Sequence, residues 1–167
     1  KQHFSKKIMI TYNDILKLNL DGVNLVAGKD GLDNVISWTY LCQTRPYADH
    51  MSRGNFALIV VDYVRFDMEE VFRTAHELYA LGISGLGVSV KEDKEKLPLK
   101  LLDWANEVKL PLFYIRWNGA SFVDIDQSIG KLLVADEEKI KKTGDYLYNL
   151  LFGYDINQRY VEKISAQ

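Results

Sequence analysis

The pattern of apolar positions along the chain first indicates three strands that are buried on both faces. Residues 56–61 and 112–115 are continuously apolar and lack the alternation of a half-exposed strand, and residues 83–90 form a further buried strand between them. Runs of this kind belong to the centre of a parallel sheet that helices cover on each side. The two stretches that separate these runs are long enough for a helix, so each neighbouring pair of strands predicts a βαβ unit.

The segment between the first two strands carries the clearest helical signal. Asp67 can cap the helix, with Glu70 as its capping-box partner, and Gly82 stands where helices commonly end. The positions that recur with helical spacing are apolar and form one stripe: Val71, Phe72, Ala75, Leu78 and Tyr79. The pattern predicts a helix between Asp67 and Gly82.

A second helix is predicted between the second and third strands. Pro98 suits the first helical position, and Pro111 marks its end. One face of this segment is apolar: Leu101, Leu102, Ala105 and Val108. Two successive βαβ units require right-handed crossovers and parallel strands. The predicted fold class is therefore α/β, with a central, mainly parallel sheet and flanking helices.

The amino-terminal part predicts a short helix and a β-hairpin in front of this sheet. Thr11 and Asp14 fit a capping box that starts the helix. Residues 23–26 and 35–42 have strand character, and glycines at positions 28 and 31 suit a turn between them. Because two short strands flank a glycine turn, we expect them to pair with each other as an N-terminal β-hairpin.

After the third strand, the pattern predicts one helix that covers the sheet and then a C-terminal helical tail. The covering helix has one apolar face: Phe122, Ile125, Ile129, Leu132 and Leu133. The tail has an apolar stripe of its own, with no strand to cover: Ile140, Leu147, Leu150 and Leu151. Such a stripe needs a partner. We expect an α/β domain over residues 8–134 and a connector over residues 135–167 that joins two chains in a homodimer.

The composition limits the partners and the location of the chain. The 167 residues include 21 Lys and Arg and 23 Asp and Glu, so the formal net charge is −2 and the chain alone is a poor DNA binder. One cysteine, Cys42, excludes an internal disulfide and a cysteine-based zinc site, and favours a reducing, cytoplasmic location. No apolar run approaches the ~20 residues of a membrane helix, so no membrane association is expected.

The motifs of common enzymes are missing. The histidines at positions 3, 50 and 76 lack metal-ligand spacing, and Ser84 lacks the following glycine of a nucleophile elbow. Gly85 and Gly87 stand within a strand and do not open a helix, so we interpret them as sites of close backbone packing and not as a dinucleotide motif. We therefore expect a chain that is not an enzyme and holds neither a metal nor a cofactor.

A binding pocket is predicted beyond the carboxyl ends of the strands, where open α/β sheets hold their ligands. Charged and aromatic side chains follow the buried strands or belong to the loop before them, and six of them are candidate ligand-binding residues: Arg45, Arg53, Asp62, Tyr63, Arg116 and Trp117. An arginine near an aromatic ring can hold a small carboxylate or a planar heterocycle. The alternative for each arginine is a surface ion pair with a neighbouring carboxylate.

Several motifs, in order, resemble the N-terminal domain of the purine-catabolism-regulator-like (PucR-like) transcription factors. They are Ile-Thr-Tyr-Asn-Asp-Ile-Leu at 10–16, Leu-Val-Ala-Gly at 25–28, Gly-Leu-Asp at 31–33, Val-Ile-Ser-Trp at 35–38, Leu-Gly-Ile-Ser-Gly-Leu-Gly at 81–87, Leu-Asp-Trp-Ala at 102–105 and Leu-Pro-Leu at 110–112. The chain departs from the family pattern at residues 54–62, where the usual Gly-Gly-Glu-Leu and Leu-Thr-Thr-Gly are replaced. If the family shares a ligand site at these residues, this chain lacks the Glu, the two Thr and the Gly that would belong to it.

The resemblance implies a front domain of a cytoplasmic regulator of metabolic genes, in which a separate C-terminal helix-turn-helix domain contacts DNA. Our leading hypothesis is a non-enzymatic domain that senses a small-molecule effector and signals through its helical connector. A ligand-free interaction or dimerisation domain is the alternative. A ligand that binds the folded chain would raise its melting temperature, so a thermal-shift screen separates the two hypotheses.

Overall fold

The computed structural model describes residues 9–43, 45–62, 67–91 and 96–135, with residues 141, 142, 144 and 147. Tyr63 and most of the predicted tail therefore lie outside the described residues. The chain divides into two units, and the fold below is that of the larger, Met9–Lys131; the other comprises Lys1–Ile8 and Leu132–Gln167.

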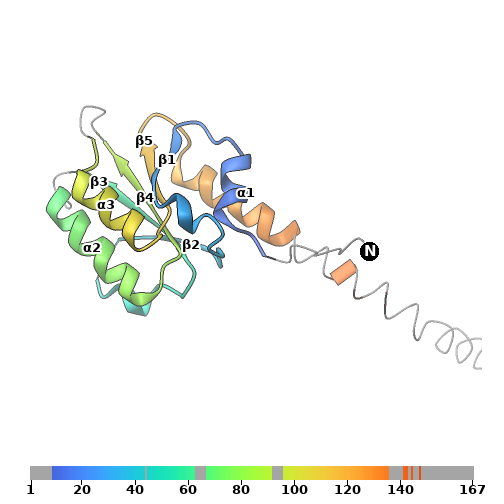
Figure 1. Ribbon diagram of the computed structural model, residues 1–167. Coiled ribbons are helices and arrows are strands. Elements are labelled where there is room, and N and C mark those ends of the chain that lie inside the picture. Colours follow the sequence, from blue (N-terminus) through green and yellow to red (C-terminus); the bar gives the residue numbers. More distant parts are fainter. Residues whose placement is uncertain are drawn as a thin grey trace, which may run out of the picture. The chain divides into compact units, whose positions relative to one another are not determined.

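Strands and helices alternate through most of this unit (Figure 1). The strands are β1 (Val23–Ala27), β2 (Thr39–Leu41), β3 (Phe56–Val61), β4 (Gly85–Val90) and β5 (Leu112–Arg116). The named α-helices are α1 (Tyr12–Lys17), α2 (Met68–Leu81) and α3 (Leu99–Glu107), and short 3-10 helices cover Lys29–Gly31 and Tyr47–Asp49. A further helix begins at Phe122 and is described as far as residue 135.

The sheet has five strands in the order β1-β5-β4-β3-β2. Strands β2, β3, β4 and β5 are mutually parallel neighbours, and only β1 runs antiparallel, against β5. The prediction of an α/β fold with a central, mainly parallel sheet is confirmed, and so are the three buried strands at its centre.

The predicted N-terminal β-hairpin is wrong, because β1 and β2 lie on opposite edges of the sheet. The turn between them does not fold one strand back onto the other. Gly28, with a positive φ of 73°, lies so close to the α3–β5 loop that an added Cβ would stand 1.8 Å from the Leu110 carbonyl oxygen. The Asn34 side chain then donates hydrogen bonds to the carbonyls of Ser84 and Lys109. These contacts carry the chain across the amino ends of β5 and β4 to the far edge.

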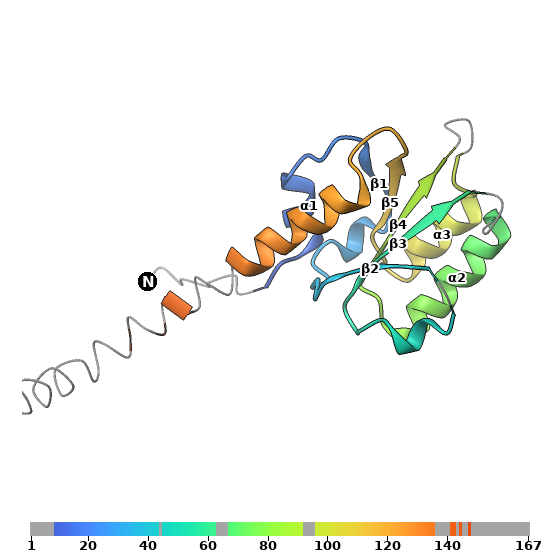
Figure 2. The same ribbon diagram turned by 180° about the vertical axis from the view of Figure 1, so that it is seen from behind.

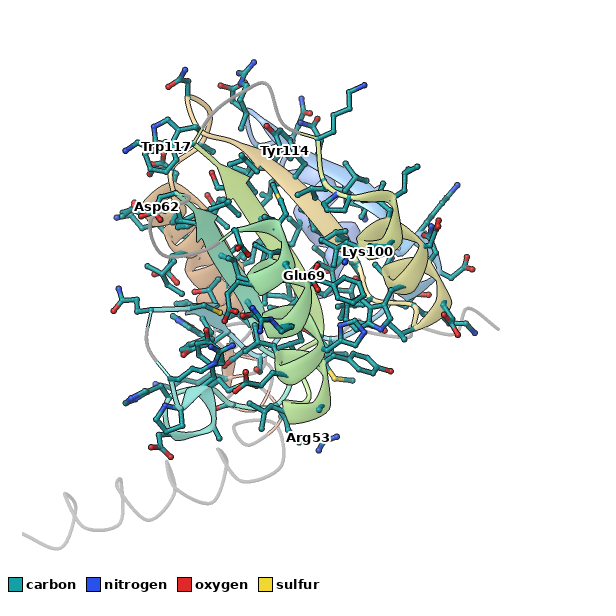
Figure 3. The ribbon with its side chains drawn as sticks, turned by 90° about the vertical axis from the view of Figure 1, so that its left-hand side faces the viewer. Arg53, Asp62, Glu69, Lys100, Tyr114 and Trp117 are labelled. Carbon is teal, nitrogen blue, oxygen red and sulfur yellow. The ribbon has the colours of Figure 1, made fainter. Side chains whose placement is uncertain are left out.

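Helices cover both faces of the sheet (Figures 1 and 2). Helices α2 and α3 lie on one face, over a core that includes Ile59, Val88 and Leu101. As predicted, Asp67 caps α2 by accepting a hydrogen bond from the Glu70 amide at 2.7 Å. An ion pair of 2.7 Å between Lys100 Nζ of α3 and Glu69 Oε2 of α2 joins the two helices at the surface (Figure 3).

Helix α1 and the helix that begins at Phe122 cover the other face. Their inward side chains include Tyr12, Ile125 and Ile129, which are completely buried. Tyr12 contacts the rings of Phe56 and Phe113, with centroid separations of 5.3 and 5.9 Å. This aromatic cluster fixes α1 near the amino ends of the central strands, so α1 leaves their carboxyl ends uncovered.

Candidate functional site

A cleft of about 230 Å³ opens on this second face, at the carboxyl ends of the three central strands. Its lining comes from the ends of these strands, from the turn after β5 and from the first turn of the C-terminal helix: Val60, Ser89, Ile115, Arg116, Trp117, Ala120, Ser121, Phe122 and Val123. This is the edge at which open α/β sheets generally bind their ligands.

The floor of the cleft is one row of side chains across three parallel strands. Val60 of β3 is in register with Ser89 of β4, and Ser89 is in register with Ile115 of β5. Because side chains alternate between the two faces of a strand, all three point to the same side. Ser89 is the small residue at the centre of the row, and the cleft lies above it.

The space above Ser89 follows from a column of small residues along β4. Gly85, Gly87 and Ser89 share one face of this strand. A Cβ added at Gly85 would stand 2.3 Å from the Tyr12 ring, and one added at Gly87 would stand 2.8 Å from methyl groups of Ile115 and Leu58. Neighbouring side chains thus fill the column at both glycines. At Ser89 the column stays open and forms the cleft.

The Ser89 hydroxyl is the polar group at the base of this space. The residue is only 3% exposed, and its side chain forms no hydrogen bond within the described part of the chain. No fully enclosed side-chain nitrogen or oxygen in that part lacks a partner, so the hydroxyl must reach the open space of the cleft. It is available to a bound molecule as a donor or an acceptor.

Two of the six predicted ligand-binding residues, Arg116 and Trp117, line the cleft together. The Arg116 guanidinium donates to both carboxylate oxygens of Asp21, at 3.0 and 3.2 Å. Asp21 precedes β1 and does not line the cleft, so this ion pair orients the Arg116 guanidinium toward the β1 side of the sheet. Trp117 is 45% exposed at the rim, and the Lys91 ammonium lies 6.0 Å from its ring centroid.

The start of the C-terminal helix forms the opposite wall. The Ser121 hydroxyl donates to Asp124 Oδ2 and accepts a hydrogen bond from the Asp124 amide, and the Ser121 amide donates to the same carboxylate. This is a reciprocal capping box. Hydrogen bonds from the Ser121 backbone and side chain lower the pKa of Asp124. The cap fixes Phe122 and Val123, the two helical residues that line the cleft.

The other predicted site residues lie away from the cleft or outside the described residues. Arg53 is at the amino ends of the strands, where a Cβ on Gly82 would stand 3.1 Å from its side chain. Arg45 lies along α2 and pairs with Glu70 at 2.6 Å and Glu77 at 3.2 Å. Asp62 directly follows β3, and in Figure 3 it lies at the same end of the domain as Trp117 and opposite Arg53. Tyr63 lies outside the described residues.

The sequence analysis predicted Arg116 and Trp117 at this edge but did not predict the floor of the cleft or its helical wall. Val60 and Ile115 were read only as core residues of their strands. The missed signal is the Gly-Leu-Gly-Val-Ser stretch of β4, in which every second residue is small. Such a stretch leaves room on one face of a sheet, which either a neighbouring side chain or a ligand can occupy.

The remaining reactive groups have structural roles. Burial, followed by the charge of Glu77, raises the pKa of the Cys42 thiol to about 12, so this side chain is a core residue and not a nucleophile. Ser84 is held by the Tyr12 hydroxyl at 2.8 Å and the Gly54 carbonyl at 2.7 Å. Within the described ranges, no group of three or more histidine, cysteine or acidic side chains is placed to hold a metal.

The described helices include none that is both long and apolar enough to cross a membrane.

A model of the Purine catabolism regulatory protein-like family, PucR, matches residues 14–133 of the chain. This range runs from α1 through β5 into the C-terminal helix and contains every residue that lines the cleft. Comparison with curated proteins gives no match.

Proposed function

This chain belongs to the Purine catabolism regulatory protein-like family, and from that premise we propose that it senses a small molecule in the cleft above Ser89. Membership of this family implies a non-catalytic regulator. The observation that carries the proposal is the open position of the β4 column. There a buried hydroxyl that has no partner among the described residues faces a cavity, at the edge where α/β sheets generally bind ligands.

The same cleft offers a route for the signal. Phe122 and Val123 form part of its lining and also belong to the first turn of the helix that leads toward the C-terminal segment. A ligand can shift a two-state equilibrium only if it binds the two states with different affinities. If the helical turn has a different position in each of the two states, a molecule that contacts it binds the two states with different affinities.

The partners proposed for the whole protein follow from this role. We propose that residues 135–167 join two chains in a homodimer, and that DNA is contacted by a separate domain and not by this chain. The effector would then act on the geometry of the dimer. A domain with no ligand and only a dimerisation role is the competing proposal, and a ligand test separates the two.

The test is a thermal-shift screen of purines, ureides, amino acids, organic acids and small neutral aromatic compounds against the full chain and two variants. Ser89→Leu places a larger apolar side chain in the cleft, while Ser52→Leu makes the same change at an exposed serine in the loop that precedes the amino end of β3. A compound at about 100 times its Kd should raise Tm by roughly 5–10 °C. The shift should persist in Ser52→Leu and vanish in Ser89→Leu. A shift that Ser89→Leu retains would place the effector elsewhere.

A further inference from the structure

We infer that the effector is an uncharged, mostly apolar molecule of about one ring, with a single hydrogen-bonding group that pairs with Ser89. This inference rests on the proposed function, because it concerns the same cleft. It adds the chemical class of the ligand, which follows from the size of the cavity, from the chemistry of its walls and from the ion pair of Arg116, a lining residue.

The size of the cleft sets the size of the ligand. An apolar protein cavity of about 150 Å³ accommodates benzene, which has six non-hydrogen atoms. The cleft here measures about 230 Å³, which by the same ratio accommodates ~9 non-hydrogen atoms. A single ring with a short substituent, or two small fused rings, fits this space.

The walls set the polarity of the ligand. The surfaces around Ser89 come largely from apolar side chains: Val60, Ile115, Ala120, Phe122 and Val123. The Ser121 hydroxyl is occupied in the helix cap, which leaves Ser89 as the free hydroxyl of the cleft. A polar ligand group that leaves water without a new hydrogen bond costs about 1–3 kcal/mol. A ligand with several polar groups is therefore rejected, and one with a single group opposite Ser89 is accepted.

The Arg116 ion pair sets the charge of the ligand. An arginine that lines a pocket would ordinarily favour a carboxylate, but both oxygens of Asp21 already accept from this guanidinium. Both of these hydrogen bonds come from Nη2, so an anionic ligand at the other guanidinium nitrogens would have to share this cation with the Asp21 carboxylate. Among the described residues, the lining therefore holds no positive side chain without a carboxylate partner, and a neutral ligand is favoured over its anion.

The test compares three probes that differ only in the group on a benzene ring: benzyl alcohol, toluene and benzoate. Binding to the full chain is measured by NMR titration. We expect benzyl alcohol to bind roughly two- to tenfold more tightly than toluene, which is the effect of one net hydrogen bond. Benzoate should bind at least tenfold more weakly than benzyl alcohol.

Variants at Ser89 assign these differences to the cleft. Ser89→Ala removes the hydroxyl and keeps the space, so benzyl alcohol should lose its advantage and bind more weakly than toluene, because its hydroxyl then has no partner in the cleft. Ser89→Leu fills the space and should abolish both; if this variant does not fold, Ser89→Val takes its place. Ser52→Ala is the matched control and should leave the affinities for all three probes unchanged.

The opposite results overturn the inference. The first is a higher affinity for benzoate than for benzyl alcohol that disappears in Arg116→Ala. The second is a higher affinity for benzyl alcohol than for toluene that survives in Ser89→Ala. The third is no binding of benzyl alcohol to the full chain. The proposed function has its own readout: a metabolite whose thermal shift is lost in Ser89→Leu would support the cleft as the effector site even if the ligand class inferred here is wrong.

Discussion

The residues of β4 show how one strand can hold the core together and also leave a cavity. Gly85 and Gly87 accept the side chains of Tyr12, Leu58 and Ile115 at distances that no Cβ would permit. Two positions later, the same face carries Ser89, and no neighbouring side chain fills the space above it. The change from glycine to serine therefore coincides with the change from a filled space to an open cleft.

At the residue scale, Gly85→Ala should destabilise the domain. Its new methyl group would stand 2.3 Å from the Tyr12 ring, which is itself held by Ser84, so the aromatic cluster must shift. Overpacking of this kind costs about 1–3 kcal/mol. The control is Gly130→Ala, whose methyl group would meet only the Trp38 ring, at 3.6 Å. Within a helix this change should be neutral or stabilising. Urea unfolding measures both, and equal midpoints would contradict the packing role of Gly85.

The candidate residues illustrate what one sequence can and cannot predict about a site. The position of Arg116 after a buried strand was sufficient to place it at the ligand-binding edge. Its ion pair with Asp21 joins residues 95 positions apart, and no local pattern predicts such a contact. Arg53 precedes a strand, and only the path of its loop decides that it lies at the amino edge. Sequence position predicted the edge for residues after strands, but not for those in the preceding loop.

At the element scale, the central strands were predicted correctly because their signal is local. Residues 56–61 are apolar throughout, and the strand that forms there is buried at almost every position. The prediction of a hairpin was wrong because it rested on the glycine turn between the two strands. A glycine turn also allows the backbone to approach a distant loop, and this is its role here. Contact with Leu110 and the hydrogen bonds of Asn34 decide where β2 goes, and both involve residues far away in the sequence.

The cap of the C-terminal helix should stabilise the wall of the cleft. Ser121→Ala removes the hydroxyl that bonds Asp124, and loss of such a cap should lower Tm by about 2–4 °C. The contribution of Asp124 has a definite pH dependence, because its pKa is lowered in the folded chain. It is fully present above the ordinary pKa of an aspartate and is lost as the pH falls through the lowered value. Thermal unfolding of Ser121→Ala and the parent chain at neutral and acidic pH measures both effects. A Tm difference that does not shrink on acidification would contradict this role of the cap.

At the scale of the whole molecule, the charge and the cleft assign different tasks to different parts of the protein. A net charge of −2 gives this chain no general attraction to phosphate, which agrees with our proposal that a separate domain contacts DNA. The unit Met9–Lys131 contains the complete lining of the cleft. Ligand binding to the cleft can thus be tested with this chain alone. The role that we propose for the C-terminal segment is to transmit the effect of ligand binding to a second copy of the chain.

The last prediction concerns that segment. Its apolar stripe includes Ile140, Leu150 and Leu151, which lie outside the described residues, and Leu147. Leaving such side chains in water forfeits about 1.5–3 kcal/mol each, and Ile140 and Leu147 are seven residues apart, a spacing that keeps them on one face of a helix. Regulators that bind two-fold DNA sites are generally dimers, and a dimer would cover the stripe.

Light scattering on the full chain and on a version that ends at Val134 tests this assembly. We expect the full chain to have twice the monomer mass at tens of micromolar, and the shortened chain to be a monomer, because the shortened chain lacks the stripe. Ser52→Leu in the full chain is the control for an added exposed leucine and should leave the mass unchanged. If the full chain is a monomer, or if the shortened chain remains a dimer, residues 135–167 are not the dimerising element, and the effector signal must leave the cleft by another route.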